Sequence, residues 1–213
     1  MSTSNRSGDG SEQPLTAKAK TVLEAATKVF LEHGFSASTT DMIQQQAGVS
    51  KATVYKHFGS KEGLFSAMVK HECDSFTGSL QSIFESGSEL TSTLETLGQR
   101  YLQILLSPRR LALYRVVVSE APRFPELGKN FYQTGPMVTR TLLAEYLGQA
   151  ASKGEIDIQQ VGADGAAGML LSMLRGETQQ ECLTHPDSHP SEVFIQQHSH
   201  RAVDAFLKAF RPV

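Results

Sequence analysis

The sequence lacks any apolar run near the roughly 18 residues that a membrane-spanning helix needs. Its N-terminus also lacks a basic stretch followed by an apolar one, so we expect no secretory signal peptide and a cytoplasmic protein. Only two cysteines are present, Cys73 and Cys182, and they lie far apart in the sequence. So few cysteines favour a reducing compartment over a disulfide scaffold, with a redox-sensing pair as the weaker alternative.

Motifs of enzymes are missing as well. The sequence contains no phosphate loop, nucleophile elbow, HExxH or paired-carboxylate motif, so we expect no catalytic residues and no cofactor. Potential metal ligands gather near the C-terminus, at Cys182, His185, His189, His198 and His200. Because ligands must converge on one point, and because Pro186 and Pro190 favour a plain polar turn, we predict no metal site.

An excess of positive charge is also lacking, since the net charge is −2. The distribution of charge is more informative than its sum. Residues 16–61 contain six lysines and three acidic residues, a net charge of +3, and the remaining residues carry −5. A basic N-terminal part can approach a polyanion such as DNA, because phosphates supply much of the binding energy.

Apolar residues recur at helical spacing, and no alternating pattern is long enough to predict a sheet. The sequence therefore predicts an all-α fold of about nine helices. Residues 1–14 are mostly Ser, Gly, Asp and Gln and predict a disordered tail. The expected helices are 16–33, 40–47, 51–58, 61–85, 89–106, 109–119, 126–152 with a kink at Gly135-Pro136, 161–183 and 191–210.

The segment 39–58 predicts a helix-turn-helix. Thr39 and Ser50 are preferred N-caps, and Gly48 between them allows the backbone conformation of a tight turn. On the second helix Val54 and Phe58 share one face and should anchor it. The opposite faces present small and polar side chains that suit a DNA groove. The alternative is a plain helix pair with a solvated surface.

A set of motifs from about Thr16 to Phe65 closely resembles the N-terminal domain of the tetracycline-repressor (TetR) family of bacterial transcription regulators. The motifs are Phe30–Phe35, Thr39-Thr40, Ile43, Ala47–Ser50, Tyr55–Phe58 and Ser60–Phe65. The segment from Glu120 to Ile158 looks, more loosely, like the effector domain of family members that often govern efflux pumps. The resemblance implies a repressor that leaves its operator when a small hydrophobic or amphipathic effector binds, in control of an efflux or lipid-metabolism operon.

By this resemblance, base-reading positions fall on Lys51, Ala52, Thr53 and Tyr55. Phosphate-contacting positions fall on Thr39, Tyr55, His57 and Lys61, and Lys56 suits either role. One departure is Gln44, where the family usually has a packed Ala, so Gln44 must turn outward or find a partner. We expect residues 15–60 to form the DNA-binding domain and 61–213 the ligand-binding and dimerisation domain.

Aromatic, Met and Arg residues of the middle helices are candidates for lining an effector cavity, although core packing would also explain them. The candidates are Phe76, Tyr101, Tyr114, Arg115, Phe131, Met137 and Arg175. His71 is a further polar residue that would need a partner if it lay inside.

The last two helices are expected to form a four-helix interface with a second copy, as the resemblance implies, with intramolecular packing as the alternative. One short helix reads few bases, whereas a dimer reaches two half-sites about 34–36 Å apart. The predicted interface residues are Gly165, Gly168, Met169, Phe194, Val203 and Phe206. A helical DNA-binding or partner-binding module without a cavity remains the alternative function, beside a helical enzyme with a vestigial head.

Overall fold

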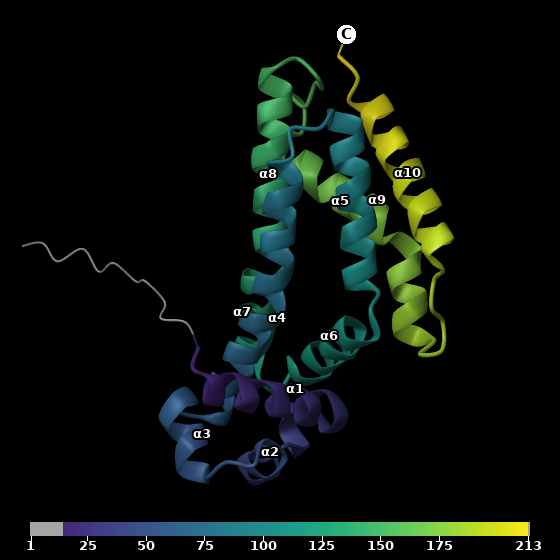
Figure 1. The fold of residues 1–213 in the computed structure, drawn as a ribbon. Helices are drawn as coiled ribbons and strands as arrows, with labels where there is room; N and C mark the ends of the chain where they lie inside the picture. Colours follow the sequence, from purple (N-terminus) through teal and green to yellow (C-terminus); the bar gives the residue numbers. More distant parts are fainter. Residues whose placement is uncertain (1–14, 213) are drawn as a thin grey trace, which may run out of the picture.

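The computed structural model describes residues 15–212, which contain ten helices and no strand (Figure 1). The all-α prediction is confirmed, whereas the predicted tail, residues 1–14, lies outside the described part. The helices are α1 Ala17–Ala37, α2 Thr40–Ala47, α3 Lys51–Phe58, α4 Lys61–Phe84, α5 Leu90–Leu105, α6 Pro108–Glu120, α7 Pro125–Thr134, α8 Pro136–Ser152, α9 Gly162–Thr184 and α10 Glu192–Ala209. None of them is long and apolar enough to cross a membrane.

Side-chain caps fix where the first helices begin. The hydroxyl of Thr39 accepts a hydrogen bond from the Met42 backbone N–H at 3.1 Å, and that of Ser50 accepts one from Thr53 at 3.2 Å. Each cap satisfies a backbone donor that has no partner inside its helix. Gly48 ends α2 in the left-handed conformation with φ of 64°. These contacts form the turn that the sequence predicts.

The segment predicted as one kinked helix, 126–152, consists of two helices. Helix α7 ends at Thr134 and α8 begins at Pro136, with Gly135 between them at φ −110° and ψ −82°. Proline has no backbone N–H to continue the ladder and fits the first position of a new helix. The break is complete, and this accounts for the tenth helix.

Helices α1–α3, which we call the head, lie at one end of the molecule, and α4 runs from the head into the other helices, the body (Figure 1). The rings of Phe30, Phe35 and Phe65 pack against one another with centroids 5.2–5.8 Å apart. The core of the head continues through α4 into α6 and α7, where Leu113 and Phe131 are buried in the same cluster. A second core fills the body between α4, α5, α8, α9 and α10.

Candidate nucleic-acid interface and ligand pocket

Helix α3 turns one face inward and leaves the other open. Val54 is only 1% exposed, and Phe58 is half-buried against the core of the head. The predicted anchoring pair therefore lies as expected. The predicted base-reading positions are on the surface of the same helix: Lys51, Ala52 and Tyr55 are exposed, and Thr53 is half-buried.

Three of these surface residues already have polar contacts. The ammonium of Lys51 pairs with the carboxylate of Asp41 on α2 at 2.9 Å, which raises the pKa of Lys51. The hydroxyl of Thr53 lies 2.9 Å from that of Ser50, and the phenol of Tyr55 lies 3.4 Å from the Thr40 hydroxyl. Such contacts hold the side chains in place on the open face. The pairs are solvent-exposed, so a DNA phosphate can compete for them.

The other residues predicted to contact phosphates differ in their solvent exposure and in their contacts within the protein. Thr39 and Lys56 are exposed, and His57 is half-buried. Lys61 instead turns toward the protein, where its ammonium donates to the carbonyls of Phe35 at 2.9 Å and Ser38 at 3.0 Å. It also lies over the Phe35 ring, 4.4 Å from the centroid. Lys61 therefore holds the end of α1 against α4, with one of its three N–H groups left over. Gln44, the departure from the family pattern, is half-buried.

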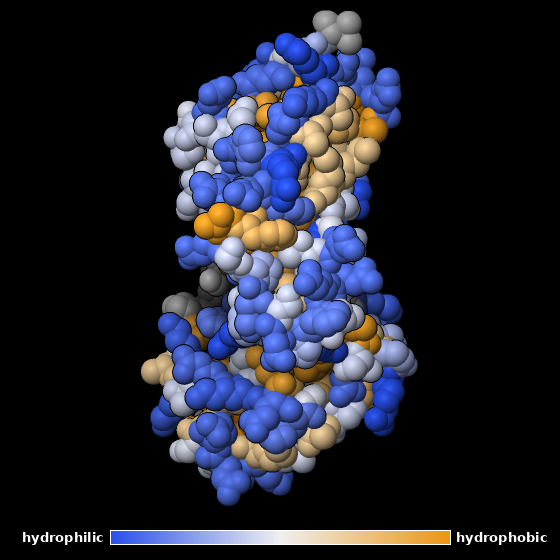
Figure 2. Space-filling model, turned by 90° about the vertical axis from the view of Figure 1, so that its right-hand side faces the viewer, coloured by the Kyte–Doolittle hydropathy of each residue, from blue (hydrophilic) through white to orange (hydrophobic). Residues whose placement is uncertain are grey.

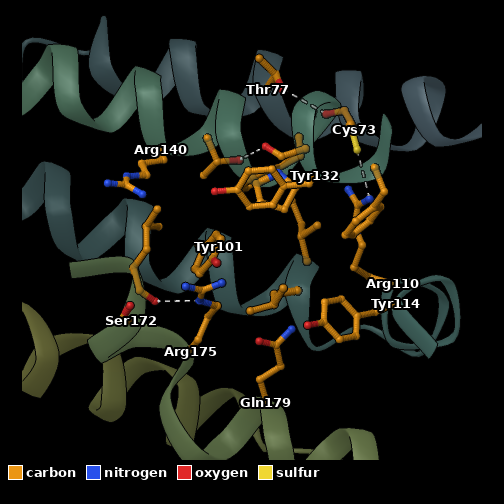
Figure 3. A pocket seen from close by; sticks show the side chains of 18 of the residues that line it. Cys73, Thr77, Tyr101, Arg110, Tyr114, Tyr132, Arg140, Ser172, Arg175 and Gln179 are labelled. Atoms are coloured by element: carbon orange, nitrogen blue, oxygen red, sulfur yellow. Dashed lines mark hydrogen bonds between the residues drawn. The ribbon is translucent and has the colours of Figure 1, made fainter. Parts of the chain in front are cut away.

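A cavity of about 190 Å³ lies between α4, α5, α6, α7, α8 and α9 (Figure 3). Five of the seven predicted residues line it: Phe76, Tyr101, Tyr114, Phe131 and Arg175. Burial raises the pKa of Tyr101 to about 12, although the charge of Arg175 opposes that rise. The phenol of Tyr101 is therefore neutral at physiological pH.

Two predicted pocket residues lie elsewhere. Arg115 donates to the carbonyls of Leu183 at 3.0 Å and Cys182 at 2.7 Å, so it caps the C-terminal end of α9. Met137 is 44% exposed and does not line the cavity, because the break at Gly135 turns the start of α8 differently from a continuous helix. His71 is exposed too. Arg115 and Met137 are therefore not part of the cavity lining, and the condition set for His71, that it lie inside, is not met.

Sequence reasoning missed several residues of the lining. They include Cys73, Thr77, Arg110, Tyr132, Thr139, Arg140, Ser172 and Gln179. The aromatic Tyr132 follows Phe131 directly and was within reach of the same argument. The arginines carried no signal in the sequence, because an exposed and a pocket-lining arginine look alike until the helices are placed.

Of the residues predicted at a dimer interface, Val203 and Phe206 are fully buried inside the single chain. They belong to the body core, where α10 packs on α5 and α9, so they are not available to a second copy, and their assignment is corrected. Gly168 lines the cavity, and a Cβ on it would lie in ordinary contact with the Arg140 side chain of α8, at 3.5 Å. The space at Gly165 is limited by Val161 of its own chain, 3.2 Å from where a Cβ would be.

Other apolar side chains of α9 and α10 are open to solvent. Met169 is 49% exposed, Met173 is 37%, Val193 is 61% and Phe194 is 36%. Met169 and Met173 lie one turn apart on the same face of α9. Figure 2, a view onto the side of the molecule where α10 lies, shows apolar side chains gathered in its upper half.

Known proteins share this architecture. Residues 22–68 match the family model for bacterial regulatory proteins of the tetR family, and residues 92–212 match the C-terminal domain of AefR-like transcriptional repressors. The HTH-type transcriptional regulator YvkB of Bacillus subtilis strain 168 is 30% identical over 143 residues, which are 64% of this chain and 69% of that protein.

Solved structures agree. A TetR-family regulator from Mesorhizobium loti superposes with a TM-score of 0.83 at 27% identity, over 92% of this chain and 97% of that one. The flavonoid-responsive regulator FrrA gives a TM-score of 0.75 at 34% identity, again over 92% and 97%. The chain therefore belongs to the TetR family of bacterial regulatory proteins: it is a DNA-binding transcriptional regulator with an AefR-like C-terminal domain, and it is not an enzyme.

Proposed function

We propose that this chain is a homodimeric repressor that acts in the cytoplasm and leaves its operator when a small amphipathic effector fills the cavity. The observation that carries the proposal is that the cavity and the core of the head have residues in common. Cys73 and Phe131 line the cavity and belong at the same time to the core that extends into the head. Because a packed core shifts as a unit, an effector that displaces these side chains moves the head as well.

The DNA-reading surface in this proposal is the open face of α3 with the N-terminus of α2. Ala52 lets the helix approach the bases, while Lys51, Thr53 and Tyr55 read base edges. Thr39, Lys56 and His57 contact phosphates, and Lys61 adds its charge next to them. We propose residues 15–60 as the DNA-binding domain and the rest of the described chain as the effector-binding and dimerisation domain.

Dimerisation through α9 and α10 is supported by their exposed apolar side chains. Burying them against a second copy would remove apolar surface from water and fix the spacing of the two heads. The proposed interface residues are Met169, Met173, Val193 and Phe194, with Gly165 beside them. A role as a purely architectural module without an effector is less supported, because such a module needs no cavity.

The effector class follows from the lining and from one relative. Five rings of phenylalanine and tyrosine line the cavity beside aliphatic side chains, which suits an effector with a flat apolar body. FrrA is described as flavonoid-responsive, and this supports a ring-bearing compound here. We propose that the regulated operon serves efflux or lipid metabolism. The identity of the genes next to this one would show which of the two it is.

The test is binding to the duplex upstream of the gene itself, measured by fluorescence anisotropy over a range of salt concentrations. We expect saturable binding whose affinity falls steeply with salt. Tyr55→Ala and Lys56→Ala should each weaken it, and Lys56→Ala, which removes a cation from a phosphate, should also reduce the salt slope by about 0.9. Lys153→Ala, an exposed lysine after α8, is the matched control and should leave binding unchanged. Absence of salt-sensitive binding would refute the proposal.

A further inference from the structure

All the charged side chains that line the cavity are positive. Arg110, Arg140 and Arg175 are among the residues that line it, and no aspartate or glutamate is. An unpaired cation in a partly apolar cavity is costly, so each arginine needs a partner from the protein or from a ligand. The partners of the three arginines therefore show where a ligand's charge would go.

Two of the three arginines are committed to the protein. Arg110 donates to the Glu72 carbonyl at 2.8 Å and contacts the Cys73 sulfur at 3.6 Å. Arg140 forms an ion pair with Asp164 on α9. Their guanidinium groups thus line the cavity but are already hydrogen-bonded to the protein.

Arg175 differs from both. Its Nε donates to the Leu171 carbonyl of its own helix at 3.3 Å, and its two terminal nitrogens have no hydrogen-bond or carboxylate partner among residues 15–212. Figure 3 shows this guanidinium inside the cavity next to the Tyr101 phenol, with Gln179 further along α9. A guanidinium whose outer edge is open in this way presents the planar fork that matches a carboxylate.

The backbone holds the fork in this position. Helix α9 is interrupted at Gly176, whose φ of 42° and ψ of −146° suit glycine and strain other residues. The break follows Arg175 directly and redirects the chain, and Arg175 and Gln179, on either side of it, both line the cavity. The Nε contact to Leu171 fixes the plane of the guanidinium group from behind.

We propose that the effector is an organic anion whose carboxylate binds the terminal nitrogens of Arg175 and whose apolar body packs among the rings of Tyr101, Phe76 and Phe131. This inference rests on the proposed function, because it takes the cavity as the effector site. Beyond the proposed function, the inference states that a negative charge on the effector is needed for tight binding. A neutral molecule of the same shape would leave Arg175 unpaired and would lose the charge-assisted hydrogen bonds.

The experiment compares matched pairs of probes. Binding of 2-naphthoate and of decanoate to the full-length protein is measured by calorimetry at neutral pH, each beside its own uncharged primary amide. We expect each carboxylate to bind roughly tenfold more tightly than its amide, a difference of about 1.4 kcal/mol, because only the carboxylate forms charge-assisted hydrogen bonds with the guanidinium group. Arg175→Gln should remove this preference, and Arg175→Lys should restore part of it. Arg201→Gln, which removes an exposed arginine of α10 that does not line the cavity, should keep it.

The outcomes separate this inference from the proposed function. If amides bind as tightly as carboxylates and release the upstream DNA equally well, the anionic class is wrong and the effector-responsive repressor stands. If neither member of either pair binds the folded protein, the inference is wrong. If the preference for the carboxylate persists in Arg175→Gln, the charge is bound elsewhere and the assignment of Arg175 fails. Folding of each variant is checked by its thermal unfolding.

Discussion

The carboxylate of Glu120, at the last turn of α6, accepts two hydrogen bonds from Ser36 at the end of α1, from the backbone N–H at 2.7 Å and from the hydroxyl at 2.5 Å. Glu120 is 8% exposed, and Arg123 reaches the same hydroxyl at 3.3 Å. At its other end α6 carries Arg110 and Tyr114 into the cavity. One helix thus connects the cavity to the head.

Replacing Glu120 by Gln should destabilise this junction in a pH-dependent way. Burial alone would raise the pKa of Glu120, but the hydrogen bonds from Ser36 and the charges of Arg123 and Lys61 outweigh it and lower the pKa below 4.5. A lowered pKa means that the carboxylate stabilises the fold above the unfolded value of about 4.5, and that this contribution is lost as the pH falls through the folded value.

We therefore expect the variant to lose about 1 kcal/mol of unfolding free energy at neutral pH, because Gln is an uncharged and weaker acceptor for the hydrogen bonds from Ser36. Its difference from the wild-type protein should shrink in acid below pH 4.5. Urea unfolding across this range measures both effects. Glu126→Gln, an exposed glutamate of α7, serves as the control and should cost little. A difference between Glu120→Gln and the wild-type protein that does not depend on pH would contradict the role given to the charge.

Lys61 and Lys56 should separate stability from DNA binding. Lys61→Met removes two hydrogen bonds from a charged donor to the carbonyls of Phe35 and Ser38, and we expect a loss of about 1.5–3 kcal/mol in unfolding free energy. Lys56→Met, at an exposed position on α3, should leave stability nearly unchanged and weaken DNA binding. Denaturant titration and anisotropy on both variants give the comparison. Equal stability of Lys61→Met and the wild-type protein would overturn the structural role of Lys61.

Removal of the negative charge at Asp41 should strengthen DNA binding. Asp41 pairs with Lys51, so Asp41→Asn frees the lysine for the groove and removes a carboxylate near the phosphates. We expect several-fold tighter binding at low salt and a cost of about 0.3–1 kcal/mol in stability from the first turn of α2. Asp204→Asn, which frees Lys208 on α10 in the same way, is the control. Weaker binding by Asp41→Asn would show that Asp41 positions Lys51 for DNA.

The two exposed methionines of α9 test the proposed dimer. Met169→Glu combined with Met173→Glu places like charges where a second copy would pack, so sedimentation equilibrium should show monomers. Val118→Glu alters an apolar side chain on α6 that is just as exposed, at 54%, and should leave the dimer intact. A dimer that survives the double change would place the interface elsewhere.

Local signals in the sequence were sufficient for the head. Thr39, Gly48 and Ser50 each act within three or four residues, and the spacing of Val54 and Phe58 defines a helix face without any distant partner. The cavity was predictable only in part. Phe76, Tyr101 and Phe131 were candidates because the middle helices are rich in aromatic residues. Nothing local distinguishes Arg175, which faces the cavity, from Arg115, which caps a helix.

The amino-acid order alone determined the helices, their caps and the inward face of α3, because those depend on neighbours along the chain. The tertiary structure decided which residues of α9 and α10 are core and which are surface, since Val203 meets α5 and Met169 meets solvent. It also decided that Lys61 holds two carbonyls of the head and that, among residues 15–212, the terminal nitrogens of Arg175 have no hydrogen-bond partner, whereas those of Arg110 and Arg140 do. These outcomes depend on contacts between segments far apart in the chain, which residue spacing within one helix does not encode.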